Sequence, residues 1–273
     1  MPDSAVAAEL LAARLLKVGR GTLAAHLERD AGEKYLEAMR RGLARLAKGE
    51  PVQYVIGEWD FRHLTLKCDR RALIPRPETE ELVTRVLAHL HRRTAQTPDR
   101  PSSPVVVDVG TGTGAIILSL AQEFKADAAF LGTDVSEDAI ALAKENAERC
   151  GLAGRVGFAV ADGLDDFDEP GEIDAIVSNP PYVTTAEWGS LDPRVREQEP
   201  RLALDGGESG LDFYDRYLGD AMNLLKPGGA VFFEIGETQG GAVRRLMESY
   251  GFSDIAVEKD WSGRDRYAFA TLP

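Results

Sequence analysis

The chain has 273 residues and a formal net charge of −13 at pH 7. Its length allows one large domain or two unequal ones, and 44% hydrophobic with 28% charged residues is typical of a globular protein. No stretch approaches the roughly 18 consecutive apolar residues of a membrane helix. The negative charge argues against a main affinity for nucleic-acid phosphates. Two cysteines are too few for a disulfide framework and lack metal-ligand spacing, so we expect a cytoplasmic, metal-free protein.

The charge is unevenly spread along the chain. Residues 1–48 carry nine Lys and Arg against six Asp and Glu, a net charge of +3, which leaves −16 on the remainder. Within residues 4–48, apolar side chains such as Leu36 and Met39 recur every three or four positions, a spacing that predicts helices. Two regions with different roles are therefore expected.

The next residues change to strand-like patterning. Residues 52–66 are rich in Val, Ile, Tyr, Trp and Phe with Gly57 in the middle, a composition that favours a hairpin. Two prolines then fix an extended segment, and we expect a helix to begin near Glu78. The polar stretch 91–104 is predicted to end that helix and to form an exposed loop.

From residue 105 onward, short β-branched runs alternate with helical patterns. The predicted strands are 105–110, 128–134, 156–160, 174–178, 230–236 and 267–272. The predicted helices lie near 113–123, 136–150, 210–225 and 238–250. Such alternation predicts an α/β fold with a doubly wound, mostly parallel sheet that helices cover on both faces. In sheets of this kind, ligands bind at the carboxyl ends of the strands.

A glycine-rich loop follows the first of these strands and opens a helix. Its sequence is Gly110-Thr111-Gly112-Thr113-Gly114. The glycines allow a tight turn and let a ligand approach the backbone without a Cβ in the way. The spacing differs from the GxGxxG of dinucleotide binders, and no Gly-Lys-Ser or Gly-Lys-Thr follows. A ligand that joins an amino acid to a nucleoside, without phosphate, is therefore favoured.

Two acidic positions accompany the loop. Asp134 ends the second predicted strand, 20 residues after Gly114, where a carboxylate can accept hydrogen bonds from both ribose hydroxyls. Asp162-Gly163 closes the third strand at the same end of the sheet, where an adenine would lie. Each feature alone also fits a simpler interpretation: a tight turn, a helix cap ahead of Ser136, and a surface turn. Together, the loop and Asp134 favour a nucleoside cofactor.

The segment Asn179-Pro180-Pro181-Tyr182 follows the fourth predicted strand. Consecutive prolines lack backbone donors and stiffen the chain, so their carbonyl groups with the Asn179 side-chain oxygen form a rigid cluster of acceptors. An amide or aromatic NH₂ is a poor nucleophile because its lone pair is conjugated. Two fixed acceptors can draw its hydrogens out of the plane and aim the lone pair at an electrophilic methyl. An Asn-Pro turn with a packed tyrosine is the simpler alternative.

These motifs together resemble those of the release factor glutamine methyltransferases of the PrmC/HemK type. The resemblance covers nearly the whole chain and also includes PVQYVIG (51–57), LIPRPETE (73–80), EPRLAL (199–204), Gly206-Gly207 and GRDR (263–266). The glycine loop and the Asn-Pro-Pro-Tyr segment alone define only a broad class of amino methyltransferases. The segments IPRPETE and EPRLAL are much more specific to this family.

The resemblance implies an organisation and a reaction. A seven-stranded Rossmann-like methyltransferase domain that uses S-adenosylmethionine would span residues 78–273, behind a helical substrate-docking domain (1–50) and a hairpin connector (51–77). The implied reaction transfers the cofactor methyl group to the side-chain amide nitrogen of the glutamine in the GGQ motif of peptide chain release factors.

Residue roles follow from the resemblance by position. Residues 110–114 and Asp134 would hold the cofactor, with Asp162, Gly163 and Asn179 also near it. Asn179 and the Pro180 carbonyl would accept the hydrogens of the glutamine amide, and Pro181 with Tyr182 would complete that site, the ring packing on the amide plane.

Two positions depart from the family pattern. Ser209 stands where relatives commonly carry Asp, so a role of that Asp does not transfer. Gly163 stands where an aromatic residue is frequent, and it offers only backbone contacts to an adenine.

Two other functions remain open on the residues alone. An amino-adenine DNA or RNA methyltransferase uses the same Asn-Pro-Pro-aromatic motif on a flipped base. The residues after position 48, however, carry a net charge of −16, which attracts phosphates weakly, and they lack a basic stretch interleaved with aromatic residues. A cofactor-sensing or scaffold protein with an inactive site is the alternative from another class. The intact motifs favour an enzyme, which we expect to act as a monomer on a protein substrate.

Overall fold

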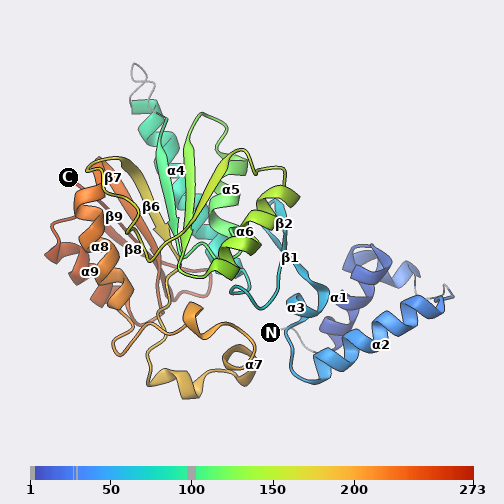
Figure 1. The fold of residues 1–273 in the computed structure, drawn as a ribbon. Coiled ribbons are helices and arrows are strands. Elements are labelled where there is room, and N and C mark those ends of the chain that lie inside the picture. Colours follow the sequence, from blue (N-terminus) through green and yellow to red (C-terminus); the bar gives the residue numbers. More distant parts are fainter. Residues whose placement is uncertain (1–3, 27, 29, 97–102) are drawn as a thin grey trace.

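In a computed structural model of the chain, residues 4–26, 28, 30–96 and 103–273 are described. They comprise a helical N-terminal part, a small hairpin and a large sheet flanked by helices (Figure 1). None of the helices within these ranges is long and apolar enough to cross a membrane.

The N-terminal part is helical, which confirms the prediction for residues 4–48. It consists of α1 (Ser4–Leu16), the 3-10 helix η1 (Arg20–His26) and α2 (Glu33–Ala47). Gly42 of α2 packs directly on the Leu11 side chain of α1, because a Cβ added at Gly42 would overlap that side chain. In Figure 1 these helices lie to one side of the large sheet, next to the hairpin.

The hairpin predicted over residues 52–66 is wrong in its first part. The elements are a short helix α3 (Val52–Ile56), then β1 (Glu58–Phe61) and β2 (Leu64–Lys67), which pair antiparallel. Pro51 precedes α3, and Gly57 ends it with a left-handed φ of +82°. A leading proline and a trailing left-handed glycine are standard helix boundaries, so Gly57 ends a helix instead of forming the hairpin turn.

A seven-stranded sheet forms the centre of the described chain after residue 103. Its strands are β3 (Val105–Val109), β4 (Ala129–Asp134), β5 (Val156–Val160), β6 (Ile173–Ser178), β7 (Leu225–Glu234), β8 (Ser253–Lys259) and β9 (Asp265–Thr271). The spatial order is β5-β4-β3-β6-β7-β9-β8, with β9 antiparallel to both neighbours and the other pairs parallel. The strand order reverses between β3 and β6, where doubly wound sheets bind ligands. The predicted doubly wound, mostly parallel sheet is confirmed.

Helices cover both faces of this sheet (Figure 1). They are α4 (Pro77–Gln96), α5 (Ala115–Glu123) and α6 (Glu137–Arg149) on one face, and α8 (Asp212–Leu224) and α9 (Gly240–Ser249) on the other. Successive strand side chains point to opposite faces: Val106 joins the first core, whereas Val107 and Val109 join the second.

Helix α4 begins where the sequence predicts but ends later. Pro77 occupies its first turn, where a missing N–H costs nothing. The helix continues to Gln96, so the start of the loop predicted at 91–104 is helical, and the His91 ring packs on the buried ring of Phe124. Part of that predicted loop, residues 97–102, lies outside the described residues.

Several elements were not predicted. The strand β8 lies at the edge of the sheet, and its residues are mostly partly exposed, so they give no apolar run. Three helices of at most four residues follow the Asn-Pro-Pro-Tyr segment: η2 (Glu187–Ser190), α7 (Pro193–Arg196) and η3 (Arg201–Ala203).

One buried side chain ties the hairpin to the glycine loop. Asn146 of α6 accepts a hydrogen bond from the Lys67 N–H at 2.6 Å and donates to the Lys67 carbonyl at 3.2 Å. It also donates to the Thr113 carbonyl at 2.9 Å and is 0% exposed. Backbone groups of β2 and of the loop therefore depend on a single amide.

We expect Asn146→Ala to lower the free energy of unfolding by about 2–4 kcal/mol, because it leaves buried backbone groups without partners. Urea denaturation measures this loss. Lys144→Ala, an exposed position on the same helix, is the control and should change the value by less than about 0.5 kcal/mol. Equal effects of the two substitutions would contradict the role of the amide.

Candidate active site

The glycine loop joins β3 to α5 at the carboxyl edge of the sheet. Gly110, Gly112 and Gly114 have φ values of +73°, +54° and +80°, a region that residues with a side chain rarely occupy. The N–H groups of Gly110 and Thr111 donate to the Thr133 carbonyl at 2.8 and 2.9 Å. These bonds hold the loop against the end of β4. At its three glycines the loop presents backbone without a Cβ atom.

Asp134 ends β4 directly beside this loop. One carboxylate oxygen accepts the Gly112 N–H and the other accepts the Ser136 N–H, each at 2.9 Å. Burial raises the pKa of this carboxyl, although the two hydrogen bonds favour its charged form. Because each carboxylate oxygen can accept more than one hydrogen bond, both retain capacity for a ligand hydroxyl.

The two residues predicted at the end of β5 separate in the structure. Asp162 is exposed and its carboxylate pairs with Arg216 at 2.7 Å, outside the pocket. Gly163 lines the pocket, and its carbonyl accepts the Thr133 hydroxyl at 2.9 Å.

Aromatic surface at this end of the pocket comes from α8. Phe213 and Tyr217 line the pocket, with ring centroids 5.9 Å apart. A Cβ added at Gly163 would lie 3.1 Å from the Tyr217 ring. The rings of α8 therefore lie next to Gly163, the position at which the family resemblance predicts an aromatic side chain.

The Asn-Pro-Pro-Tyr segment leaves β6 at the switch point. Asn179 and Pro181 line the pocket, whereas Pro180 is buried behind them. Tyr182 packs against the second core, its carbonyl accepts the Gln239 side-chain amide at 3.1 Å, and burial raises the pKa of its hydroxyl to about 12. Tyr182 therefore belongs to the packing of the second core and does not line the pocket.

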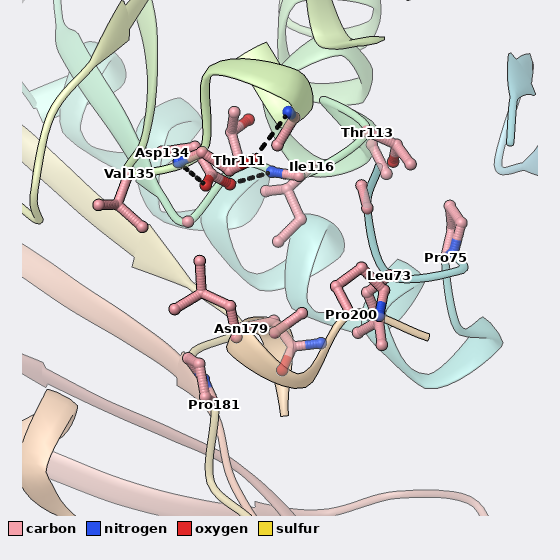
Figure 2. Close-up of a pocket in the computed structure, with 18 of the residues that line it drawn as sticks. Leu73, Pro75, Thr111, Thr113, Ile116, Asp134, Val135, Asn179, Pro181 and Pro200 are labelled. Carbon is pink, nitrogen blue, oxygen red and sulfur yellow. Dashed lines mark hydrogen bonds between the residues drawn. The ribbon is translucent and has the colours of Figure 1, made fainter. Parts of the chain in front are cut away.

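Figure 2 shows how residues around the pocket lie: Asp134 and its neighbour Val135 are across the pocket from Asn179 and Pro181. The predicted residues that line this one pocket are Gly110, Thr111, Gly112, Thr113, Asp134, Gly163, Asn179 and Pro181. Those that do not line it are Gly114, Asp162, Pro180 and Tyr182. The functional roles of all twelve stay predictions.

Two glycines allow a close approach to the Asn-Pro-Pro-Tyr backbone. A Cβ added at Gly206 would lie 2.7 Å from the Pro181 carbonyl oxygen, and one at Gly210 would lie 2.6 Å from the Tyr182 carbonyl oxygen. Between them, the Ser209 hydroxyl donates to Asp212 at 2.8 Å. Glycine is therefore needed at both positions to keep the segment in place.

Two segments to which the sequence assigned no site role form a wall of the pocket. They contribute Leu73, Ile74, Pro75, Arg76, Thr79, Pro200, Leu202 and Ala203. The fully buried carboxylate of Glu199 joins them, because it accepts from the Arg76 guanidinium at 2.6 Å and from the Ile74 N–H at 3.2 Å. Their strong resemblance to family motifs was the one signal that could have marked them.

Two buried polar side chains form a chain of hydrogen bonds with Asn179. The Asn179 Nδ2 donates to Thr79 Oγ1 at 3.3 Å, and the Thr79 hydroxyl donates to Glu234 Oε2 at 2.6 Å. Glu234 ends β7 and is 2% exposed, and burial raises its pKa to about 7. A lone acid at a strand end carries no motif, so no sequence pattern marks it.

Asp108, inside β3, is a second buried acid near the loop. Its carboxylate accepts the Thr111 hydroxyl at 2.7 Å, and burial raises its pKa to about 7. Among the described residues, no three His, Cys, Asp or Glu side chains gather in a way that could hold a metal ion.

A doubly wound sheet with a glycine loop and an Asn-Pro-Pro-Tyr segment at its switch point defines a methyltransferase of Rossmann-like fold. The family model of the methyltransferase domain matches residues 102–249. The hMettl16 catalytic domain, solved in complex with MAT2A 3'UTR hairpin 6, superposes with a TM-score of 0.60 at 17% sequence identity, over 86% of this chain and 82% of that one. Human methyltransferase 10 domain containing protein superposes with a TM-score of 0.56 at 18% sequence identity, over 77% of this chain and 88% of that one. These two likenesses concern the fold alone.

Sequence relatives are more specific. The family model of the PrmC N-terminal domain matches residues 1–57. The release factor glutamine methyltransferase of Bacillus cereus is 37% identical over 97% of this chain and 92% of its own length. The enzyme of Moorella thermoacetica is 40% identical over 95% of this chain and 88% of its own length. The human MTRF1L release factor glutamine methyltransferase is 37% identical over 85% of this chain and 70% of its own length. The chain belongs to the release factor glutamine methyltransferase family.

Glu234 makes the stability of the fold depend on pH. Its folded-state pKa of about 7 lies above the ordinary value of 4.5, so its contribution to stability is fully present below about pH 4.5 and is lost as the pH rises through about 7. We expect Glu234→Gln to gain stability relative to wild type across this range, measured as the difference in unfolding free energy by urea denaturation. Titration of Asp108 and His89 is common to both proteins and cancels. A difference that stays constant with pH would contradict this assignment.

Proposed function

We propose that this protein transfers the methyl group of S-adenosylmethionine to the side-chain amide nitrogen of the glutamine in the GGQ motif of peptide chain release factors. The observation that carries this proposal is the position of Asn179 across one pocket from the glycine loop and Asp134. Membership of the family supports the release factor as the substrate.

The pocket has the features that this cofactor requires. The glycine loop presents backbone without Cβ atoms to the amino-acid part, and both Asp134 oxygens can accept a ribose hydroxyl. Val135, Gly163 and the Phe213 ring offer apolar surface for the adenine. When bound, the cofactor supplies an electrophilic methyl group on a sulfonium.

The residues of the Asn-Pro-Pro-Tyr segment would activate the substrate. Because the Asn179 nitrogen is engaged by Thr79, its Oδ1 is available to accept one hydrogen of the glutamine amide, and the Pro180 carbonyl would accept the other. Holding both hydrogens turns the nitrogen lone pair out of conjugation and toward the methyl group. A nitrogen that has gained a methyl group is strongly acidic and loses its proton to water, so no side-chain base is needed.

We propose the same division of labour along the chain as the sequence predicts. Residues 1–50, with the net charge of +3 counted over 1–48, would dock the release factor, residues 51–77 would connect, and residues 78–273 would carry out the transfer. The match of residues 1–57 to the PrmC N-terminal domain supports this division. The protein would act as a monomer in the cytoplasm, on a protein and not on a nucleic acid.

The test of the function is a methylation assay with labelled S-adenosylmethionine and two substrates side by side, a release factor and duplex DNA. We expect label in the release factor, and no label once the glutamine of its GGQ motif is replaced by alanine. Label in DNA but not in the release factor would overturn the proposal in favour of an amino-adenine methyltransferase.

The division between substrate activation and cofactor binding is tested with Asn179→Ala. We expect kcat to fall by roughly 30- to 1000-fold, since one acceptor is worth about 2–4 kcal/mol in the transition state. The dissociation constant for S-adenosylmethionine, measured by calorimetry, should change by less than about threefold.

The matched variant at the opposite wall is Asp134→Asn, which keeps the size of the side chain but replaces one acceptor by a donor. It should weaken cofactor binding by about tenfold or more, because a charged acceptor is lost. Equal losses of cofactor affinity and of rate in the Asn179 and Asp134 variants would contradict the proposed division.

A further inference from the structure

The side-chain amide of Asn179 must be held one way round to work as an acceptor. Its oxygen and nitrogen ends have nearly the same shape, and rotation by half a turn would present NH₂ in place of the oxygen. An NH₂ group facing the NH₂ of the substrate glutamine would repel it. Something in the fold therefore has to set the direction of this amide.

Thr79 and Glu234 set this direction by their hydrogen-bond chemistry. The Thr79 hydroxyl has a single hydrogen and donates it to Glu234 Oε2 at 2.6 Å. A carboxyl group keeps an oxygen that can only accept whether or not it is ionised. Toward Asn179 the same oxygen then offers only lone pairs. The atom of Asn179 that lies 3.3 Å from it must therefore be the nitrogen, which leaves the oxygen for the pocket.

We propose that Thr79 and Glu234 are positioning residues that fix the Asn179 amide with its oxygen toward the substrate nitrogen. The proposal rests on the proposed function, because it assigns what prepares the acceptor of that same reaction. It also assigns a role to Thr79, the threonine of the LIPRPETE segment, for which the sequence pattern predicted no chemical function.

The surroundings of Glu234 fit this role. Burial raises the pKa of this carboxyl, and the nearby charge of Glu78 acts in the same direction. The charges of Arg266 and Arg76 favour its ionised form. Arg266 is itself held by a hydrogen bond to the Ile235 carbonyl at 3.1 Å. These two arginines come from the LIPRPETE and GRDR segments, so both family segments converge on the carboxylate that orients Thr79.

A purely structural role would be that Thr79 stabilises the first turn of α4. Thr79 lies inside the first turn of α4. Its oxygen accepts from Asn179, and its hydrogen goes to Glu234, 155 positions away in sequence. Thr79 is 4% exposed and lines the pocket beside Asn179. A positioning role predicts that loss of the Thr79 hydroxyl lowers kcat, whereas a purely structural role predicts no selective change in kcat.

Thr79→Val replaces the hydroxyl by a methyl group of similar size and breaks both hydrogen bonds. We expect kcat for release factor methylation to fall by about 10- to 100-fold. The KM for the release factor and the calorimetric dissociation constant for S-adenosylmethionine should stay within about twofold. A parallel loss of cofactor affinity, or an unchanged kcat, would overturn the proposal.

Two control variants separate chemistry from folding. Thr79→Ser keeps the hydroxyl and should restore most of kcat, whereas a merely space-filling role would make it no better than valine. Thr84→Val makes the same replacement on the exposed side of α4, and should leave kcat as it is. Cofactor binding measures the folded fraction of every variant.

Glu234→Gln tests the direction of the chain of hydrogen bonds. A glutamine can present either its oxygen or its NH₂ group to Thr79, so the direction of the Asn179 amide is no longer imposed and kcat should fall several-fold. In the Thr79→Val background the same change should have no further effect on kcat, because Glu234 acts only through the hydroxyl. Additive losses in the double variant would contradict the proposal.

Failure of this inference is distinguishable from failure of the proposed function. If the wild-type protein does not label a release factor, the proposed function fails. If wild type labels it and Thr79→Val has the same kcat, the proposed function stands and the positioning role is excluded.

Discussion

The buried carboxylate of Glu199 holds together parts of the pocket that the chain leaves far apart. Its partners, Arg76 and the Ile74 N–H, come from more than 120 positions earlier in the sequence. Removing a carboxylate from water costs several kcal/mol, and the guanidinium and N–H offset this cost only in good geometry. The pair anchors the segment that leads into α4, and with it Thr79, next to the strand ends that carry Asn179 and Glu234.

The local pattern predicted most of the fold because most strands are buried. Strands such as β3 and β6 are covered on both faces, so apart from one aspartate in each they appear in the sequence as mainly apolar runs. The edge strand β8 has no such run, since solvent reaches much of it. The composition of α3 favours a strand, yet the left-handed Gly57 and the burial of Tyr54 make it helical. Burial of that kind is a property of the tertiary structure.

The residues of the site also fall into a group that the sequence pattern predicted and a group that it did not. The glycine loop, Asp134 and Asn179 each follow a predicted strand, and parallel strands bring their carboxyl ends to one edge, so sequence order was enough to group them. The groups that support Asn179 are not near it in sequence. Thr79 precedes it by 100 positions, and Glu234 lies 155 positions beyond Thr79. Pairs of this kind follow from the packing of α4 against the sheet, which no local pattern encodes.

The glycines around the pocket differ in what a protein engineer could do with them. At Gly206 and Gly210 a Cβ would collide with the Pro181 and Tyr182 carbonyl oxygens, so every substitution there in a mutant library would shift the backbone that carries the proposed acceptors. At Gly163 the nearest atoms belong to the side chains of Tyr217 and Arg216, and its φ of +71° suits asparagine or aspartate better than other residues. A library meant to alter cofactor selectivity should therefore vary position 163 together with 217, and keep 206 and 210 as glycine.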